Sequence, residues 1–490
     1  MFPSLSKIPV GISEPAWRII PAGSRPRVVF LLLLMAAITQ ASLGQPQQPP
    51  THFLIGGTLV TPDGVIAHGW LDVDKGRILH LERTKPEIPG VPAVETDDLI
   101  FAGFIDLHNH PGFNVFPRWT PPHTFPDRYA WRDWEVYQEQ LERKGYALLG
   151  DPSAFCDLDE YAEVKALIGG ATSMIGMGAD ARNHPGTASP DCVRGLVRNL
   201  DHFTGFYGTA VDEERVANSI GILPRDMNAN AAARYARAIR EGSLDLLAIH
   251  IAEGLPTDEE SAQELDMLEA RGLLGPHTAL IHAVGLSPSQ LGRVARAGAS
   301  MVWSPHSNFV LYGATANVDA AFREGVTISL APDWSPTGSD NMWEEIQYAH
   351  GVSKRDLNGL FSNRQLVEMA SSVPARVAHI DDKVGTIATG MLADFFLVKP
   401  TVTNPYDAIV EGDIASSVDM VMINGVPVYG SPEMLERFGV AMEPLTICGR
   451  PKALNSAALP AGSFAGVSAR LEQRMKALGA ELAPLDECGR

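Results

Sequence analysis

Histidines and one carboxylate stand at the ends of several apolar segments of this chain. His108 and His110 follow the apolar segment Leu99–Leu107, and Pro111–Gly112 turns the chain directly after them. Two residues apart in an extended chain, the two imidazoles point to the same side. A converging pair of imidazoles is a typical beginning of a metal site. Further ligands must come from other parts of the chain.

The other candidate residues repeat this pattern. Short apolar segments end at His250, His282, His306 and Asp333. If the segments are strands of a barrel, their carboxyl ends meet on one face, where active sites lie. A set rich in histidine with one carboxylate suits Zn²⁺ or Fe²⁺, whereas Ca²⁺ and Mg²⁺ prefer oxygen ligands. A catalytic ion with an open position lowers the pKa of bound water towards about 7.

Glu253 and a long interval without lysine refine the predicted site. Glu253 follows His250 by three residues, in His-Ile-Ala-Glu, and is well placed to carry a proton beside a metal-bound hydroxide. No lysine occurs between Lys165 and Lys354, so the middle strands cannot supply a lysine that bridges two metals. We expect Lys165 itself to be solvated. The sequence therefore predicts a single-metal site, unless a carboxylate such as Glu213 or Glu214 bridges a second ion.

Alternating strands and helices are expected to position these residues. Between about Ile100 and Ile380, apolar strand-like segments alternate with helical patterns, which implies a parallel sheet. At this length a (β/α)8 (TIM) barrel is the leading α/β architecture, and one further strand must lie within 178–243, with Phe203–Ala210 as one candidate. A doubly wound open sheet is the alternative. No GxGxxG follows the first strand, so a dinucleotide site is not supported.

The segments outside the barrel strands and helices are predicted to form three further parts of the structure. Short strands with glycine turns in residues 52–98 and 384–450 predict one composite β-sandwich that flanks the barrel of residues 99–383. The long aromatic-rich segment Pro111–Asp157 is expected to be a lid or binding loop, an auxiliary subdomain over the barrel rim, or both. Residues 451–490 are expected to form a C-terminal tail with one amphipathic helix at about Val467–Leu478.

The N-terminal segment predicts export. The unbroken apolar run Val28–Ile38 follows Arg25 and Arg27 and precedes small residues and a Gln/Pro-rich spacer. That order is typical of a secretory signal peptide, and the run is shorter than the ~20 apolar residues that span a bilayer. We therefore predict that residues 1–44 are a signal peptide and that the mature protein is periplasmic or secreted.

Composition narrows the partners. A net charge of -19 argues against nucleic acid or an anionic membrane as a partner. The candidate metal site makes a small-molecule substrate the predicted partner, and a homo-oligomer is left open. In an exported protein the four cysteines either form disulfides, in any of three pairings, or stay as buried thiols. They are Cys156, Cys192, Cys448 and Cys488.

Taken together, these features resemble the amidohydrolase superfamily over residues 52–445. The matching elements are Phe104-Ile-Asp-Leu-His-Asn-His110, His250-Ile-Ala-Glu253, His282, Asp333 and the split β-sandwich. The resemblance implies that one divalent metal ion, zinc in preference to iron, is held by His108, His110, His250 and Asp333. It also implies that Asp333 takes a proton from water, that His282 orients water and substrate, and that Glu253 protonates a ring nitrogen.

The His-x-x-Glu element and the missing lysine resemble one branch of that superfamily. This mononuclear branch includes guanine, cytosine and S-adenosylhomocysteine deaminases and triazine hydrolases. Ser304-Pro-His-Ser-Asn308 resembles its Pro-x-x-Asn segment, with His306 as an addition of unassigned role. The implied activity is hydrolysis of carbon–nitrogen bonds other than peptide bonds, by deamination of an aminated heterocycle. The alternatives are hydrolysis of a cyclic amide or a ring substituent, or an inactive metal-binding homologue.

Overall fold

The computed structural model describes residues 49–177, 192, 195–201, 215–219 and 223–488. The predicted signal peptide and the candidate strand Phe203–Ala210 lie outside these residues. Residues 46–490 form one compact unit. Within the described part of the chain, no helix combines the length and the apolarity needed to cross a membrane.

Eight short strands of the described chain form a barrel. They are β5 (Phe104–Asp106), β6 (Ala171–Met174), β7 (Arg198–Asn199), β8 (Val216–Ser219), β9 (Leu246–Ile251), β10 (Thr278–His282), β11 (Ser300–Trp303) and β12 (Thr327–Leu330). Parallel pairing joins β5-β6-β7 and β12-β11-β10-β9-β8. The first and last strands meet beyond their carboxyl ends, where the amide of Asp333 donates to the carbonyl of His108 (3.1 Å). The predicted α/β class and (β/α)8 barrel are confirmed.

Two of these strands, β7 and β8, lie in the interval where the sequence indicated only one. They have two and four residues. The two residues of β7 are too few to show alternation, for which at least four are needed, and the four residues of β8, Val-Ala-Asn-Ser, do not alternate strictly between apolar and polar. The presence of eight strands was therefore expected from the barrel fold, and the sequences of β7 and β8 did not indicate it.

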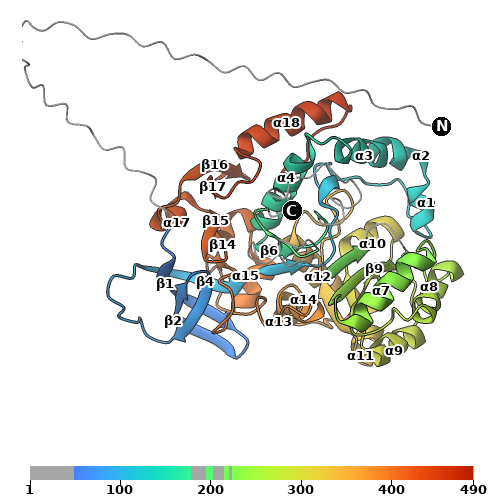
Figure 1. Cartoon of the computed structure of the whole chain (residues 1–490), viewed down its shortest axis with the longest axis horizontal. Coiled ribbons are helices and arrows are strands. Elements are labelled where there is room, and N and C mark those ends of the chain that lie inside the picture. The colour runs from blue at the N-terminus through green and yellow to red at the C-terminus, as the bar shows by residue number, and fades with distance from the viewer. Residues whose placement is uncertain (1–48, 178–191, 193–194, 202–214, 220–222, 489–490) are drawn as a thin grey trace, which may run out of the picture. The chain divides into compact units, whose positions relative to one another are not determined.

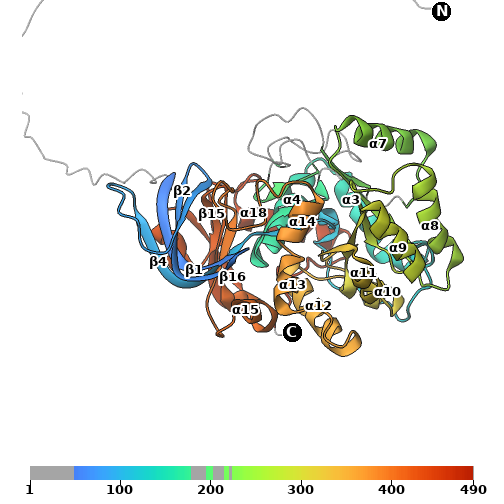
Figure 2. The ribbon, with the colours of Figure 1, turned by 90° about the horizontal axis from the view of Figure 1, so that it is seen from below.

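Helices alternate with the strands and are bounded by capping residues. They are α7 (Ala229–Glu241), α8 (Glu259–Ala270), α9 (Pro288–Ala297), α10 (Pro305–Tyr312), α11 (Val318–Glu324), α12 (Met342–Asp356), α13 (Asn363–Glu368) and α14 (Ser372–Val377). In α9, Ser287 and Gln290 form a reciprocal capping box, and Gly298 ends the helix with a left-handed φ of 73°. Figures 1 and 2 show α7 to α11 gathered on the side away from the N-terminal strands.

Segments from both ends of the described chain share one nine-stranded sheet. Its strands are β1 (His52–Thr61), β2 (Gly64–Asp74), β3 (Arg77–Glu82), β4 (Ala93–Ala102), β13 (Phe395–Val398), β14 (Val418–Ile423), β15 (Val426–Gly430), β16 (Met442–Ile447) and β17 (Arg450–Asn455). The antiparallel pairing of β4 with β13 joins the two segments, and Figure 1 shows the blue and red strands side by side. The sheet extends to Ala102 and Asn455, past the predicted limits at residues 98 and 450. The strands predicted at both ends of the chain are therefore joined in one continuous hydrogen-bonded sheet.

The segment after β5 is largely helical. It contains a 3-10 turn (Pro111–Phe113), α1 (Arg128–Arg132), α2 (Glu135–Tyr137), a π-helical turn (Gln138–Glu142), α3 (Arg143–Leu149) and α4 (Phe155–Ile168). The C-terminal helix α18 (Phe464–Ala477) packs on α4, with the rings of Tyr161 and Phe464 stacked at 5.8 Å. Arg470 and Arg474 both bond Asp157 at the start of α4. The C-terminal segment is thus part of the packed unit.

Two disulfides select one of the three open pairings. Cys156 on α4 is bonded to Cys192, and Cys448 after β16 is bonded to Cys488 near the C-terminus. The Cα atoms are 5.3 Å apart in both bridges. The second bridge holds the end of the chain against the sheet.

The expectation that Lys165 is solvated is wrong. Its side chain is only 1% exposed, and its Nζ lies 2.8 Å from Asp340 Oδ1. It also donates to the hydroxyl of Ser335 (2.8 Å) and to the carbonyl of Asn114 (3.3 Å). The lysine is buried because the loop after β12 brings a carboxylate to it, which compensates the charge.

Candidate active site

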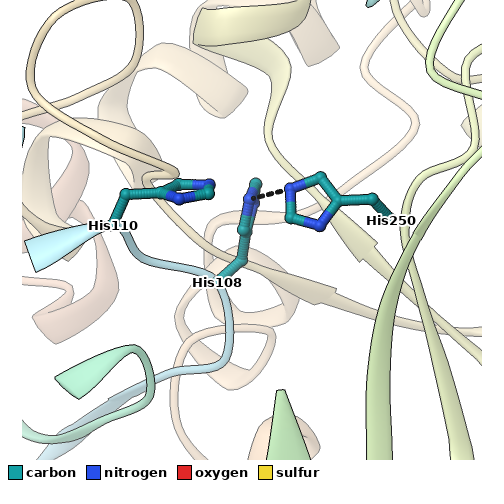
Figure 3. Close-up of side chains that lie close together, drawn as sticks. All are labelled: His108, His110 and His250. Atoms are coloured by element: carbon teal, nitrogen blue, oxygen red, sulfur yellow. Dashed lines mark hydrogen bonds between the residues drawn. The ribbon is translucent and has the colours of Figure 1, made fainter. Parts of the chain in front are cut away.

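Three barrel strand ends bring the predicted metal ligands together. His108 and His110 follow β5, His250 is the last residue but one of β9, and Asp333 follows β12. Figure 3 shows the imidazole of His108 between those of His110 and His250. The ring centroids of His108 are 5.4 Å from His110 and 4.8 Å from His250. Convergence of strand ends on one barrel face produces this arrangement.

The potential ligand atoms are within a few ångströms of one another. The Nε2 atoms of His108 and His250 are 3.1 Å apart. Asp333 Oδ1 lies 3.2 Å from His108 Nε2 and 3.4 Å from His110 Nε2. His282 belongs to the same cluster, since its ring centroid is 4.7 Å from that of His108. The four histidines and Asp333 therefore meet, and distance alone does not separate His282 from the predicted ligands.

Strand alternation and local strain aim these side chains. Leu246 and Ala248 of β9 lie in the buried cluster inside the barrel, and His250 continues their alternation. His282 and Asp333 have positive φ values of 67° and 69°, in a region that residues other than glycine rarely adopt. Such conformations cost about 1–3 kcal/mol each and concentrate at functional sites.

The donor set fits a divalent metal ion. Imidazole nitrogens with one carboxylate are ligands typical of zinc or iron. His108 pairs its Nδ1 with the hydroxyl of Ser304 (2.9 Å), which leaves its Nε2 for a metal. The Nδ1 of His250 is buried and has no hydrogen-bond partner among the described residues. The nitrogen of His250 that faces the other ligands is Nε2, which lies 3.1 Å from His108 Nε2, so it is the atom placed for ligation.

Burial sets the protonation states of the cluster. Burial, together with neighbouring positive groups, lowers the pKa of His108 and His250 well below the usual value, that of His110 to about 3 and that of His282 to about 4. These imidazoles are therefore neutral at pH 7, which is the form that binds metal. Burial raises the pKa of the Asp333 carboxyl well above its usual value, and a cation beside it favours the ionised form.

Glu253 lies two residues beyond β9, beside the histidine cluster, and both of its carboxylate oxygens are held. Arg128 Nη1 donates to Oε2 (2.9 Å), and the hydroxyl of Tyr312 donates to Oε1 (2.7 Å). The same Oε1 is 3.7 Å from His282 Nε2. Glu253 is 2% exposed. It is therefore an internal carboxylate next to the cluster and not a surface charge.

Arg128 and Tyr312 are the site residues that sequence reasoning missed. Arg128 is the first residue of α1 in the aromatic-rich segment, and Tyr312 is the last residue of α10. Neither belongs to a motif with a metal or catalytic spacing. The aromatic content of Pro111–Asp157 was the only signal that this segment reaches the site.

Within the Ser304–Asn308 element, Ser304 and Asn308 contact the histidine cluster, whereas His306 does not. Asn308 Nδ2 lies 2.8 Å from His282 Nδ1 and orients that ring. His306 points elsewhere, because its ring stacks on Tyr348 (4.2 Å between centroids) and its Nδ1 pairs with the hydroxyl of Ser339 (3.0 Å). His306 is therefore a packing residue of the neighbouring helix layer.

Comparison with known proteins agrees with this geometry. Residues 225–428 match the amidohydrolase family. This match agrees with the superfamily that the motifs resemble. Within it, a 5-methylthioadenosine/S-adenosylhomocysteine deaminase of Desulforudis audaxviator is 25% identical over 355 residues, which are 67% of this chain and 80% of that protein.

Two solved structures share the superfamily fold with this chain. An adenosine deaminase from Xanthomonas campestris with bound zinc aligns with a TM-score of 0.64 at 17% identity, over 88% of this chain and 100% of that one. An atrazine chlorohydrolase from Arthrobacter aurescens complexed with zinc aligns with a TM-score of 0.59 at 14% identity, over 77% and 95%. The predicted superfamily is confirmed, and with it a hydrolase that uses a divalent metal ion. The individual residue roles stay predictions.

Proposed function

We propose that this protein is a hydrolase acting on carbon–nitrogen bonds other than peptide bonds, and that it releases ammonia from an aminated heterocycle. The observation that carries this proposal is the convergence of a histidine-rich metal site with an internal carboxylate, Glu253, 3.7 Å from His282. A metal site needs a neighbouring proton carrier to deaminate a ring. The deaminases among the similar proteins support the same reaction class.

One zinc ion completes the proposed site. His108, His110, His250 and Asp333 would hold it, and a bound ion lowers the pKa of a coordinated water enough for attack at neutral pH. The zinc in the two aligned structures supports zinc over iron. No lysine occurs between Lys165 and Lys354, so strands β6 to β12 supply none to bridge a second ion, and Lys165 itself pairs with Asp340.

The chain's own residues divide the proton transfers in this proposal. Asp333 accepts one proton from the attacking water and passes it to the departing amine, which leaves as ammonia. Glu253, when protonated, gives its proton to a ring nitrogen and regains one from the attacking water as the carbonyl forms, and its carboxyl group lies close enough to His282 for both to act on one substrate. His282, oriented by Asn308, positions water and substrate.

Ammonia release tests the proposal directly. We would screen aminated heterocycles and cyclic amides with the zinc-loaded protein and measure ammonia and bound metal. The expected result is turnover of at least one aminated ring with one metal per subunit. Glu253→Gln should abolish turnover without changing the metal content, and Glu135→Gln, an exposed acid (64% of its side chain) on α2, is the control. A protein that binds less than one metal per subunit, or a fully active Glu253→Gln variant, contradicts the proposal.

A second candidate is hydrolysis of a displaceable ring substituent. The structural similarity to an atrazine chlorohydrolase favours it, because attack by activated water on a ring carbon is common to both reactions. The product decides between them. Chloride or an alkylamine released without ammonia favours the second candidate.

We also propose that the protein is exported after cleavage near Gly44. The basic, apolar and small-residue order of the N-terminus supports export. The two disulfides support it as well, because such bonds persist in oxidising compartments. Expression of the full chain followed by fractionation and N-terminal mass analysis tests this proposal. An unprocessed N-terminus in the cytoplasmic fraction contradicts it.

A further inference from the structure

We propose that Arg128 and Tyr312 are positioning residues that fix the two oxygens of the Glu253 carboxylate for proton transfer. This inference rests on the proposed function, in which Glu253 is the proton carrier. It adds a role for two residues that lie outside the metal-ligand motifs. It also makes the segment after β5 a working part of the active site.

The geometry of the contacts supports a positioning role. Each carboxylate oxygen of Glu253 has its own donor, Arg128 Nη1 on Oε2 and the Tyr312 hydroxyl on Oε1. The terminal torsion of a free glutamate is broad, so an unheld carboxylate samples many orientations. Two donors on opposite oxygens restrict that torsion. They leave Oε1 facing His282 at 3.7 Å.

The two donors are themselves fixed. The amide of Arg128 donates to the Glu253 carbonyl (2.9 Å), so backbone and side chain of the arginine hold the same glutamate. The amide of Leu255 donates to the carbonyl of Pro126 (2.7 Å), which ties the two segments together once more. On the other oxygen, Trp131 Nε1 donates to the Tyr312 hydroxyl (2.7 Å). This hydroxyl accepts one hydrogen bond, from Trp131, and donates another, to Glu253, so its direction is set.

Burial makes the arrangement rigid and dry. Arg128 is 6% exposed, Tyr312 2% and Trp131 5%. Catalytic groups that must be positioned to within a fraction of an ångström are held by buried, hydrogen-bonded neighbours such as these. A displacement of about 1 Å lowers a rate by about 100-fold. Loss of one donor should therefore reduce turnover more than it reduces substrate binding.

A purely structural ion pair makes a different prediction. If Arg128 and Tyr312 only stabilise the fold, their replacement lowers the melting temperature and the metal content and changes kcat only through the folded fraction. If they position Glu253, kcat falls while KM and metal content stay near those of the parent protein. The ratio of the kcat change to the KM change separates the two roles.

The test uses the zinc-loaded full-length protein and a substrate from the ammonia screen. Tyr312→Phe removes one donor and keeps the ring, and we expect kcat to fall about 10- to 100-fold with KM within about 3-fold. Arg128→Lys keeps the charge and loses the planar fork, with a similar loss expected. Tyr137→Phe is the control, since its ring packs 4.9 Å from that of Trp131 in the same aromatic cluster. It should retain kcat within about 2-fold.

Chemical rescue gives a measurement that a purely structural role of Arg128 would not affect. In Arg128→Ala, added guanidinium ion should restore part of kcat in a saturable way, whereas the same concentration of potassium chloride should not. Unchanged kcat in both Tyr312→Phe and Arg128→Lys overturns the proposal, and so does a kcat loss that merely follows metal loss. An active Glu253→Gln variant would overturn the proposed function instead, which distinguishes the two failures.

Discussion

Replacing Lys165 by methionine removes the cation of a buried ion pair beside the loop that carries Asp333. In the folded protein the Nζ of Lys165 lies 2.8 Å from Asp340 Oδ1. Arg118 is more distant from the same carboxylate, at 3.9 Å. Methionine has a similar shape without the charge, so Asp340, which is 5% exposed, would lose its close partner. Breaking one side of a buried pair costs about 3–5 kcal/mol.

Thermal unfolding measures this loss. For a cooperative unit of about 440 residues the entropy of unfolding is about 0.9 kcal/mol/K, so Tm should fall by about 3–5 °C. Adding Asp340→Asn to the Lys165 variant should restore most of the loss, because the buried group is then neutral. Lys75→Met, with 83% of its side chain exposed, is the control and should change stability by no more than about 0.5 kcal/mol.

The pH dependence of stability tests the same ion pair, Lys165 with Asp340. Burial alone raises the pKa of Asp340, but Lys165 and Arg118 outweigh burial and hold it below 3.8. A carboxyl group with a depressed pKa stabilises the fold above its unfolded pKa and loses that contribution as pH falls through the folded value. The deficit of Lys165→Met should therefore be largest at neutral pH and should shrink below about pH 4. A variant that melts like the Lys75 control, or a deficit that persists with Asp340→Asn, refutes this reasoning.

Three further perturbations follow from the site and its surroundings. His250→Asn should reduce bound zinc from one per subunit to below about 0.1 by elemental analysis; full occupancy would contradict the ligand assignment. Burial raises the pKa of Glu264 from 4.5 to about 8, while its Oε2 accepts from the amide of Ala252 (2.7 Å). A carboxyl group with a raised pKa destabilises the fold increasingly as pH rises from 4.5 to about 8, so Glu264→Gln should raise Tm at pH 8.5 and leave it unchanged at pH 4; an equal shift at both values would argue against it. Cys448→Ser with Cys488→Ser should lower the free energy of unfolding in urea by about 2–4 kcal/mol, and an unchanged midpoint would show that the bridge contributes nothing.

The metal cluster was predictable because its members share a local pattern. His108, His250 and His282 each end an apolar segment, and parallel barrel strands bring such ends together whatever loops lie between them. Glu253 was predictable for a related reason, since its spacing from His250 fixes it near the same strand end. A local pattern combined with a fold rule was enough for these residues.

The donors to Glu253 were not predictable in this way. Arg128 and Tyr312 lie 125 and 59 residues from Glu253 in sequence, and each occupies an ordinary helical position. Only the path of the segment after β5, which the sequence left open, brings the arginine to the strand end. Contacts that depend on the path of an irregular segment carry no periodic signal.

Lys165 shows the same limit for stability. Lysine is almost always exposed, and thirteen of the fourteen residues of α4 are buried. The helix lacks a solvent-exposed face because the loop after β12 and the C-terminal helix α18 cover it from two directions. The partner of Lys165, Asp340, is 175 residues away. A lysine on an all-buried helix indicates a distant carboxylate, and the sequence alone does not say which one.

These buried pairs connect the position of Asp333 to segments far from it in sequence. Ser335, two residues after Asp333, accepts a hydrogen bond from Lys165 on α4, and its amide donates to the Asn114 side chain (3.0 Å) in the segment after β5. Arg118 of that segment pairs with Glu487 near the C-terminus (3.3 Å). The strained φ of Asp333 persists because these neighbours over-determine the loop. The loop that carries the predicted metal carboxylate is thus held by an early helix, an insertion and the end of the chain, so its stability and its chemistry should change together.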